Sequence, residues 1–122
     1  MTNCLFCGMV AGEVPANVVL ETDRVLAFRD INPQAPIHVL LVPKRAIPRL
    51  GSARSGDEGL LGEVVEATSA VARQEGLVSD GADEPGYRLV TNTGPEAGQT
   101  VFHVHVHVLG GRGMGWPPWP AG

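Results

Sequence analysis

The chain has 122 residues, of which 43% are hydrophobic and 18% are charged, a balance typical of one globular domain that excludes intrinsic disorder. Its formal net charge is −4 and its basic residues are scattered, so we expect neither nucleic acid nor an anionic membrane as a partner. No apolar run has the length of a membrane span, and the first residues do not resemble a signal peptide. We therefore expect a single cytoplasmic domain over residues 1–122.

Near the start of the chain, Cys4 and Cys7 are separated by two residues. This spacing suits half of a metal site or a redox pair better than a structural disulfide. The pair alone does not decide between these two roles.

Three short apolar segments follow, at residues 17–21, 24–28 and 39–42. Polar residues at 22–23 separate the first two, which predicts a β-hairpin. Two prolines stiffen the next turn, at residues 31–36. Asp30 and His38 flank this turn at strand ends, where polar side chains can face a pocket rather than the core.

The one clear helical pattern lies between Ser55 and Gly76. Ser55 precedes Glu58 by three residues, which is the spacing of a capping box, and Gly76 is expected to end the helix. Apolar residues recur at helical spacing on one side, while charged residues take the other. We therefore assign this helix to the core rather than to the functional surface.

Residues 87–91 alternate as a strand and lead to a glycine-containing loop at residues 94–100. Glycine permits positive φ angles and lets a ligand approach backbone amides closely. The loop runs directly into a segment in which His103, His105 and His107 alternate with valine. On a strand, these three histidines share one face while the valines fill the core.

Two kinds of chemistry fit three aligned imidazoles. One is metal binding, since three protein ligands with an open position are typical of a catalytic metal site. Residues two apart on a strand diverge by about 6.5–7 Å, however, so a straight row does not converge on one ion. The other is covalent and acid–base catalysis, with the middle histidine as nucleophile between its two neighbours and near the loop amides. The geometry favours this second chemistry.

The segment after the histidines, residues 110–120, is rich in glycine and proline, which precludes regular structure. It nevertheless carries both tryptophans of the chain. Large aromatic side chains on an irregular tail usually have a surface on which to dock.

The run from His103 to Leu109 resembles the His-x-His-x-His-x-x signature of the histidine triad (HIT) superfamily, with a hydrophobic residue at every x. Other segments resemble the Hint-like branch of nucleoside phosphoramidases: Leu26-Ala27-Phe28 with Asp30, Pro33-Gln34-Ala35-Pro36 before His38, Val42-Pro43-Lys44, Gly98-Gln99-Thr100, Gly110-Gly111-Arg112, Met114 and Trp116-Pro117-Pro118. The likeness covers nearly the whole chain. The histidine run together with the tryptophan-containing ending is highly specific.

This resemblance implies an α+β fold with an antiparallel sheet of about five strands and one main helix. It also implies a homodimer, in which the sheets of two protomers become continuous. Residues 110–122 would form a tail that reaches the partner's active site, where Trp116 would contact the substrate.

The implied reaction is hydrolysis of the P–N bond of a purine nucleoside 5′-phosphoramidate of the adenosine 5′-phosphoramidate type, releasing AMP or GMP. His105 would attack the α-phosphorus and form a nucleotidyl-histidine that water then cleaves. His107 would contact the phosphate, and His103 and His38 would complete the network that sets the tautomer of His105. The other implied substrate contacts are Leu5, Phe6, Phe28 and Ile31 at the base, Asp30 at the ribose, and Asn92, Gly98, Gln99 and Thr100 at the phosphate.

Two positions depart from the pattern of this branch. Thr100 replaces a common serine and keeps the hydroxyl. Many bacterial relatives hold zinc with a Cys-x-x-Cys pair, the first histidine of the run and a histidine that closes a Pro-Lys-x-His segment. That segment ends in Ala46 in this chain, so Cys4, Cys7 and His103 lack the fourth ligand of a closed site. We therefore expect no metal and no other cofactor.

Two other functions stay open. A dinucleotide polyphosphate hydrolase or a nucleotidyl transferase of the same superfamily would share the His105 intermediate and differ in leaving group. The Trp116-Pro117-Pro118 ending favours the phosphoramidase over these. A protein that binds nucleotides as a scaffold, with incidental catalysis, is the third candidate.

Overall fold

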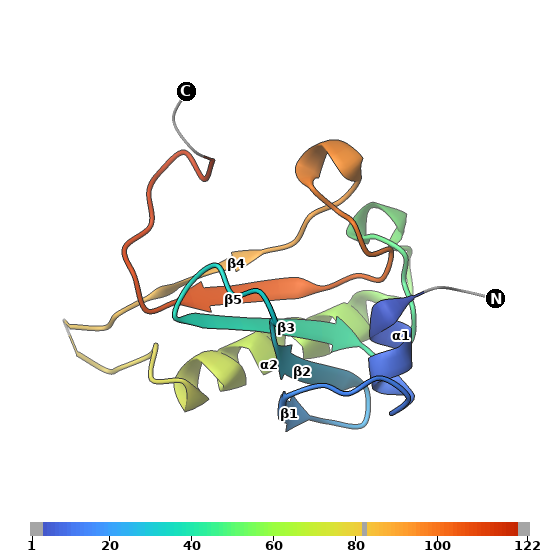
Figure 1. The fold of residues 1–122 in the computed structure, drawn as a ribbon, viewed down its shortest axis with the longest axis horizontal. Coiled ribbons are helices and arrows are strands. Elements are labelled where there is room, and N and C mark those ends of the chain that lie inside the picture. The colour runs from blue at the N-terminus through green and yellow to red at the C-terminus, as the bar shows by residue number, and fades with distance from the viewer. Residues whose placement is uncertain (1–3, 82, 120–122) are drawn as a thin grey trace.

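The computed structural model describes residues 4–81 and 83–119, and it is built around one antiparallel sheet (Figure 1). The strands are β1 (Val18–Glu21), β2 (Val25–Arg29), β3 (Ile37–Pro43), β4 (Tyr87–Val90) and β5 (Val106–Gly110). Their order in the sheet is β1-β2-β3-β5-β4. The other elements are the helices α1 (Leu5–Val10) and α2 (Glu58–Gln74) and the 3₁₀ helices η1 (Leu50–Ser52) and η2 (Pro95–Ala97). The predicted α+β fold, with a five-stranded sheet and one main helix, is confirmed.

Helix α2 covers one face of the sheet and carries the main core (Figure 1). Val64 and Val71 of the helix pack in one cluster with Val39 of β3 and Val108 of β5. Burying a side chain of this size stabilises the fold by about 1.5–3 kcal/mol. Because strand side chains alternate, the neighbouring residues on these strands point to the opposite face, which α2 leaves open. No helix among the described residues is long and apolar enough to cross a membrane.

Helix α1 packs on part of that opposite face. Its Phe6 is buried in a second cluster with Leu26, Phe28, Leu40 and Val42. The sequence did not predict this helix, because six residues are too few to show a helical period. Burial of Phe6 fixes the helix on the sheet instead.

The hairpin between β1 and β2 and the end of α2 agree with the predictions. In the hairpin turn, the Thr22 hydroxyl accepts a hydrogen bond from Val25 N at 3.0 Å. At the helix end, Gly76 has a φ of 78°, a left-handed conformation that only glycine adopts at low cost. Leu77 N then donates to Ala72 O at 2.8 Å, which satisfies a carbonyl of the last turn.

The predicted capping box at Ser55 and Glu58 is wrong. Helix α2 begins at Glu58 with Asp57 as its N-cap residue. The Glu58 carboxylate accepts from Gly56 N at 2.6 Å rather than from Ser55. Asp57 takes the cap position because its carboxylate organises the preceding turn, accepting from Arg54 N at 2.8 Å.

Candidate active site

The turn at residues 31–36 brings Asp30 and His38 together on the open face of the sheet. Asp30 N donates to His38 O at 3.0 Å, and the Asp30 carboxylate lies 3.5 Å from His38 Nε2. The strand register then places His38 opposite Leu109 and Leu40 opposite His107. His38 and His107 are therefore neighbours across β3 and β5, although 69 positions separate them in the sequence.

The histidine run is not the straight strand that the sequence suggested. Strand β5 begins at Val106, so His107 lies within it while His103 and His105 precede it. The rings of His105 and His107 still lie 5.1 Å apart. The rings of His103 and His105 both contact Phe6 of α1, with centroids 6.3 Å and 4.9 Å away. Val104 and Val108 pack on the side of α2 instead, so the predicted division into a histidine face and a core face holds although only part of the run is a strand.

A contact with the segment before η1 explains this bend. Val104 N donates to Ile47 O at 2.6 Å, and the two side chains pack with Leu60 in a small separate core. This contact takes the place of backbone pairing with β3, which begins only at Val106. A period-two pattern in the sequence does not reveal so distant a competing contact.

A backbone N–H fixes the tautomer of His38, and the His38 side chain in turn fixes that of His107. Gln34 N donates to His38 Nδ1 at 3.0 Å, so this nitrogen is an acceptor and the proton of the neutral ring is on Nε2. His38 Nε2–H then donates to His107 Nδ1 at 2.9 Å. The proton of neutral His107 is consequently on Nε2, where it can be donated to a ligand.

A carbonyl group fixes His105 in the opposite tautomer. His105 Nδ1 lies 2.8 Å from His103 O, and because a carbonyl oxygen only accepts, Nδ1 carries the proton. The lone pair of His105 is therefore on Nε2. Phe6 packs edge-on against the ring at 4.9 Å and restricts its rotation. An unprotonated nitrogen held in this way is a competent nucleophile.

Burial lowers the pKa values of three histidines below their usual range. Desolvation is the largest cause for His38, His103 and His107. At His107, the nearby His105 and His38 lower the pKa further, to about 4, although the Asp30 carboxylate opposes this shift. All three rings are therefore neutral at pH 7.

Acid should consequently destabilise the fold between about pH 6.5 and 4. The folded chain binds fewer protons than the unfolded chain in this range, so the free energy of unfolding falls as the pH falls. A His107 pKa of about 4 predicts a loss of about 2 kcal/mol between pH 6.5 and pH 5. Urea unfolding at several pH values measures this loss. His107→Gln should reduce the pH dependence, and an unchanged dependence would contradict the assignment.

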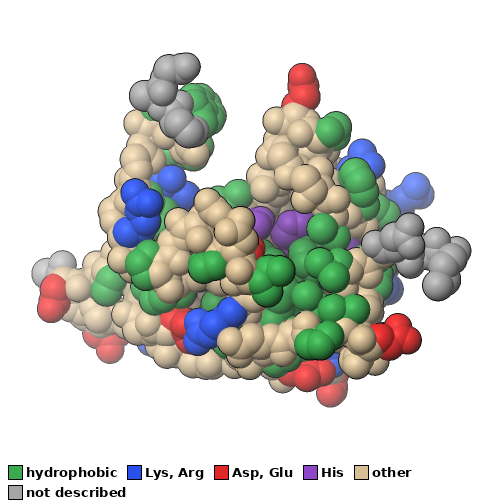
Figure 2. Space-filling view, viewed as in Figure 1, with side chains coloured by type: hydrophobic (Ala, Val, Ile, Leu, Met, Phe, Trp, Pro, Cys, Tyr) green, Lys and Arg blue, Asp and Glu red, His purple; other side chains and the backbone are tan. Residues whose placement is uncertain are grey.

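A cavity of about 200 Å³ lies beside the two catalytic candidates His105 and His107. It is lined by residues of α1, β2 and the turn after it, β3, the loop before β5 and β5 itself: Leu5, Phe6, Met9, Phe28, Arg29, Asp30, Ile31, Leu40, Thr100, Val101, His105 and His107. The fold thus gathers every predicted base and ribose contact, together with Thr100, around one cavity. The histidines lie at the floor of a notch between the C-terminal arm, residues 111–119, and the loop that carries η2 (Figure 2).

Four predicted contacts do not line this cavity: Asn92, Gly98, Gln99 and Trp116. Gln99 is buried and braces its loop, because its amide accepts from Gly94 N at 2.8 Å and donates to Pro48 O at 2.7 Å. Its side chain is therefore occupied by the protein itself. Trp116 lies on the arm with 83% of its surface exposed.

The sequence missed the backbone groups that orient the histidines, namely Gln34 N and the carbonyls of His103 and Pro43. The only available signal was the pair of prolines around Gln34, which indicates a rigid turn.

Comparison with known proteins identifies the family. The HIT domain family matches residues 11–114 of the chain. The chain belongs to the HIT domain family. A HIT family hydrolase from Legionella pneumophila has a solved structure that matches this HIT chain with a TM-score of 0.89 and 47% identity, covering 96% of this chain and 100% of the other.

Two curated relatives of this HIT chain have informative names. A 14 kDa zinc-binding protein of Zea mays is 47% identical over 93% of this chain and 86% of its own length. The adenylylsulfatase HINT1 of Arabidopsis thaliana is 44% identical over 93% of this chain and 75% of its own length.

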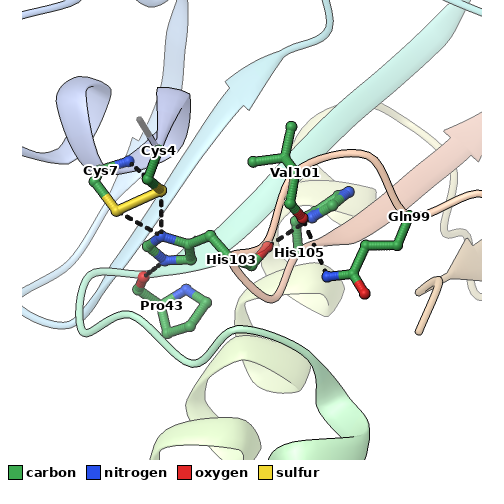
Figure 3. Close-up of a disulfide and its surroundings, with 7 residues drawn as sticks. All are labelled: Cys4, Cys7, Pro43, Gln99, Val101, His103 and His105. Carbon is green, nitrogen blue, oxygen red and sulfur yellow. Dashed lines mark hydrogen bonds between the residues drawn. A yellow bond between two sulfur atoms is a disulfide. The ribbon is translucent and has the colours of Figure 1, made fainter. Parts of the chain in front are cut away.

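Cys4, Cys7 and His103 form a group of potential metal ligands in the HIT chain (Figure 3). The cysteines are joined as a disulfide, and each sulfur lies 3.3 Å from His103 Nδ1. His103 Nε2–H donates to Pro43 O at 2.6 Å, which leaves Nδ1 free to bind. With the cysteines reduced, these donors fit three positions of a zinc ion, but Ala46 supplies no fourth ligand.

Asp30, His38 and His107 form a second group with close ligand atoms. The two histidine nitrogens that face each other are only 2.9 Å apart and share a proton. Two nitrogens that bind one ion at about 2.0–2.1 Å in tetrahedral geometry lie farther apart than this. The geometry therefore fits a hydrogen-bonded pair rather than a metal site.

Proposed function

We propose that this HIT chain is a hydrolase that cleaves the P–N bond of purine nucleoside 5′-phosphoramidates in the cytoplasm. The observation that carries the proposal is the tautomer of His105, which leaves an unprotonated Nε2 beside a nucleoside-sized cavity. The similarity to a HIT family hydrolase supports hydrolytic chemistry.

In the proposed reaction, His105 Nε2 attacks the α-phosphorus, the P–N bond breaks, and the amine leaves with a proton from solvent. The product on the enzyme is a nucleotidyl-His105. Water then attacks the same phosphorus, releases the nucleoside monophosphate and returns His105 to its neutral form. The first attack uses the lone pair of His105 Nε2, so this nitrogen must carry no proton at the start.

The role proposed for His107 follows from its low pKa. A ring with a pKa of about 4 is neutral at pH 7, and a neutral imidazole is a poor proton donor in acid catalysis. Its Nε2–H is instead a fixed hydrogen-bond donor for a phosphoryl oxygen. This donor stabilises the charge that develops on the phosphoryl group.

The walls of the cavity suit a nucleoside. Phe6 and Phe28 offer aromatic surface, with ring centroids 5.5 Å apart. Ile31, 93% exposed, and Leu5, 44% exposed, lie at the mouth, where a base would cover them. We propose that the base lies among these residues and that the Asp30 carboxylate accepts hydrogen bonds from the ribose hydroxyls.

A comparison of leaving groups tests the function. The protein would be incubated with adenosine 5′-phosphoramidate, diadenosine tetraphosphate and adenylyl sulfate, the last because one relative is named an adenylylsulfatase. We expect the phosphoramidate to have the largest kcat/KM. Faster cleavage of the dinucleotide would favour the polyphosphate hydrolase, and binding without turnover of any of them would favour the scaffold protein.

We propose a homodimer in which β4, an edge strand, pairs with its counterpart in the partner subunit. An exposed edge is prone to pairing, and Leu89 of β4 is 42% exposed. Trp116 and Trp119, 83% and 67% exposed, lie on the arm that would reach the partner. A protein of monomeric mass in sedimentation would contradict this arrangement.

Deleting residues 113–122 should change the preference among amine leaving groups more than the affinity for AMP. The arm would contact the leaving group, whereas the base and ribose contacts lie in the cavity. Residues 120–122 lie outside the described part of the chain. Kinetics on several phosphoramidates, with Trp116→Ala as the narrower variant, measure the effect. Unchanged selectivity in the truncated protein would contradict it.

We propose that the reaction needs no metal or other cofactor. Treatment with a chelator should leave kcat unchanged, because the nucleophile and its hydrogen-bond partners are all protein groups. Elemental analysis of the treated and untreated protein gives the zinc content. A loss of activity that zinc restores would overturn this proposal.

A further inference from the structure

The proposed nucleotide would lie across the strands of the sheet, with its nucleoside over β2 and its phosphorus over β5. The base and ribose contacts Phe28 and Asp30 belong to β2 and the residue that follows it, whereas His107 belongs to β5. Strands β3 and β5 lie between β2 and β4 in the sheet. A substrate that has its nucleoside over β2 and its phosphorus at β5 therefore extends its leaving group over β4.

The register shows which β4 side chains lie on this path. Val90 pairs with His107, and Arg88 pairs with Leu109, which also pairs with His38. Residues paired across an antiparallel ladder share a face, so Arg88 and Val90 lie on the face of the histidines. Arg88 is the only charged residue of β4.

Arg88 is held in place but keeps most of its hydrogen-bonding capacity. One of its terminal nitrogens donates to Gly115 O on the arm at 2.8 Å. Among the described residues, no carboxylate forms a salt bridge with it. Because a guanidinium has five N–H donors, several remain for a ligand.

Arg88 also lines a groove of about 520 Å³ that adjoins the histidine network. Gln34, whose backbone N–H orients His38, lines the same groove, together with Leu109 and Arg112. In Figure 2, basic side chains lie at the foot of the arm, beside the notch with the histidines. The groove thus places the guanidinium groups of Arg88 and Arg112 next to the turn that orients His38.

We propose that Arg88 binds an anionic group on the leaving amine. This inference rests on the proposed function and deepens it: the preferred substrates are nucleoside 5′-phosphoramidates of amines that carry a carboxylate, such as amino acids. A planar carboxylate matches the forked donors of the guanidinium.

The test compares two substrates that differ in one charge, the glycine phosphoramidate of AMP and its N-methylamide. The wild type should prefer the free carboxylate in kcat/KM. Arg88→Ala should reduce this preference by about three- to tenfold, the range for a partly exposed charged hydrogen bond, while Arg88→Lys should retain most of it. Arg73→Ala, in the last turn of α2, is the matched control and should leave the preference unchanged.

The outcomes separate this inference from the proposed function. If Arg88 only holds the arm through Gly115, Arg88→Ala slows both substrates equally, and the inference is wrong. A wild type that cleaves both substrates without preference also overturns it and leaves the phosphoramidase activity intact. If neither substrate is cleaved, the proposed function fails. In that case, the affinities of His105→Ala and His105→Ala/Arg88→Ala for the two compounds decide whether Arg88 recognises the carboxylate.

Discussion

His105→Ala should reduce kcat by about 10⁴-fold or more, because it removes the only group proposed to bond to phosphorus. The loss should greatly exceed that of any change at a residue that only binds the substrate. His105→Asn and His105→Gly should be equally inactive, although asparagine keeps a donor for His103 O. Single-turnover kinetics with the phosphoramidate measure the loss, and thermal unfolding of each variant checks that the fold is retained.

The nucleotidyl adduct itself distinguishes His105 from its neighbours. The reaction would be quenched without acid and the enzyme digested for mass spectrometry. The adduct should lie on the peptide that contains the histidine run, and fragmentation of this peptide should assign it to His105. Neither of the other two rings presents an unprotonated nitrogen to the cavity. The unprotonated Nδ1 of His103 faces the sulfurs of Cys4 and Cys7, and His103 does not line the cavity. The unprotonated Nδ1 of His107 accepts from His38, and its Nε2 carries a proton. An adduct on His103 or His107 would overturn the mechanism.

Asp30→Ala should weaken nucleotide binding by about 10²-fold, since hydrogen bonds to a charged group contribute about 1.5–3 kcal/mol each. The structure adds a second role, because the Asp30 carboxylate also accepts from Asn32 N at 2.8 Å and so holds the turn. Asp30→Asn separates these roles, since its amide oxygen can keep the turn bond while the charge is lost.

Nucleotides without ribose hydroxyls provide the second measurement. Wild-type protein should bind AMP much more tightly than 2′,3′-dideoxy-AMP, and Asp30→Asn should reduce this difference while unfolding at nearly the wild-type temperature. If the wild type binds the two nucleotides equally, Asp30 serves only the turn. Calorimetric titration with each nucleotide gives both affinities.

The sequence determined the elements whose signal is local. The apolar runs of β2 and β3, the apolar stripe of α2 and its end at Gly76 all follow from residue types and backbone conformation within one segment. The concentration of histidine at residues 103–107 likewise marked the site, because histidine is suited to chemistry near neutral pH. The resemblance to the HIT superfamily then supplied individual roles, and the structure brings the residues expected at the base and ribose together with His105 and His107 around one cavity.

Only the tertiary structure decided which groups each histidine contacts and which tautomer it adopts. Val104 bonds to Ile47 and bends the run, which sends His103 to the cysteines and leaves His105 facing His107. The tautomers depend on backbone groups of other segments, and Arg88 joins the histidine face only through the register of β4 and β5. These features arise from contacts between residues far apart in the sequence, and periodicity within a segment carries no information about such contacts.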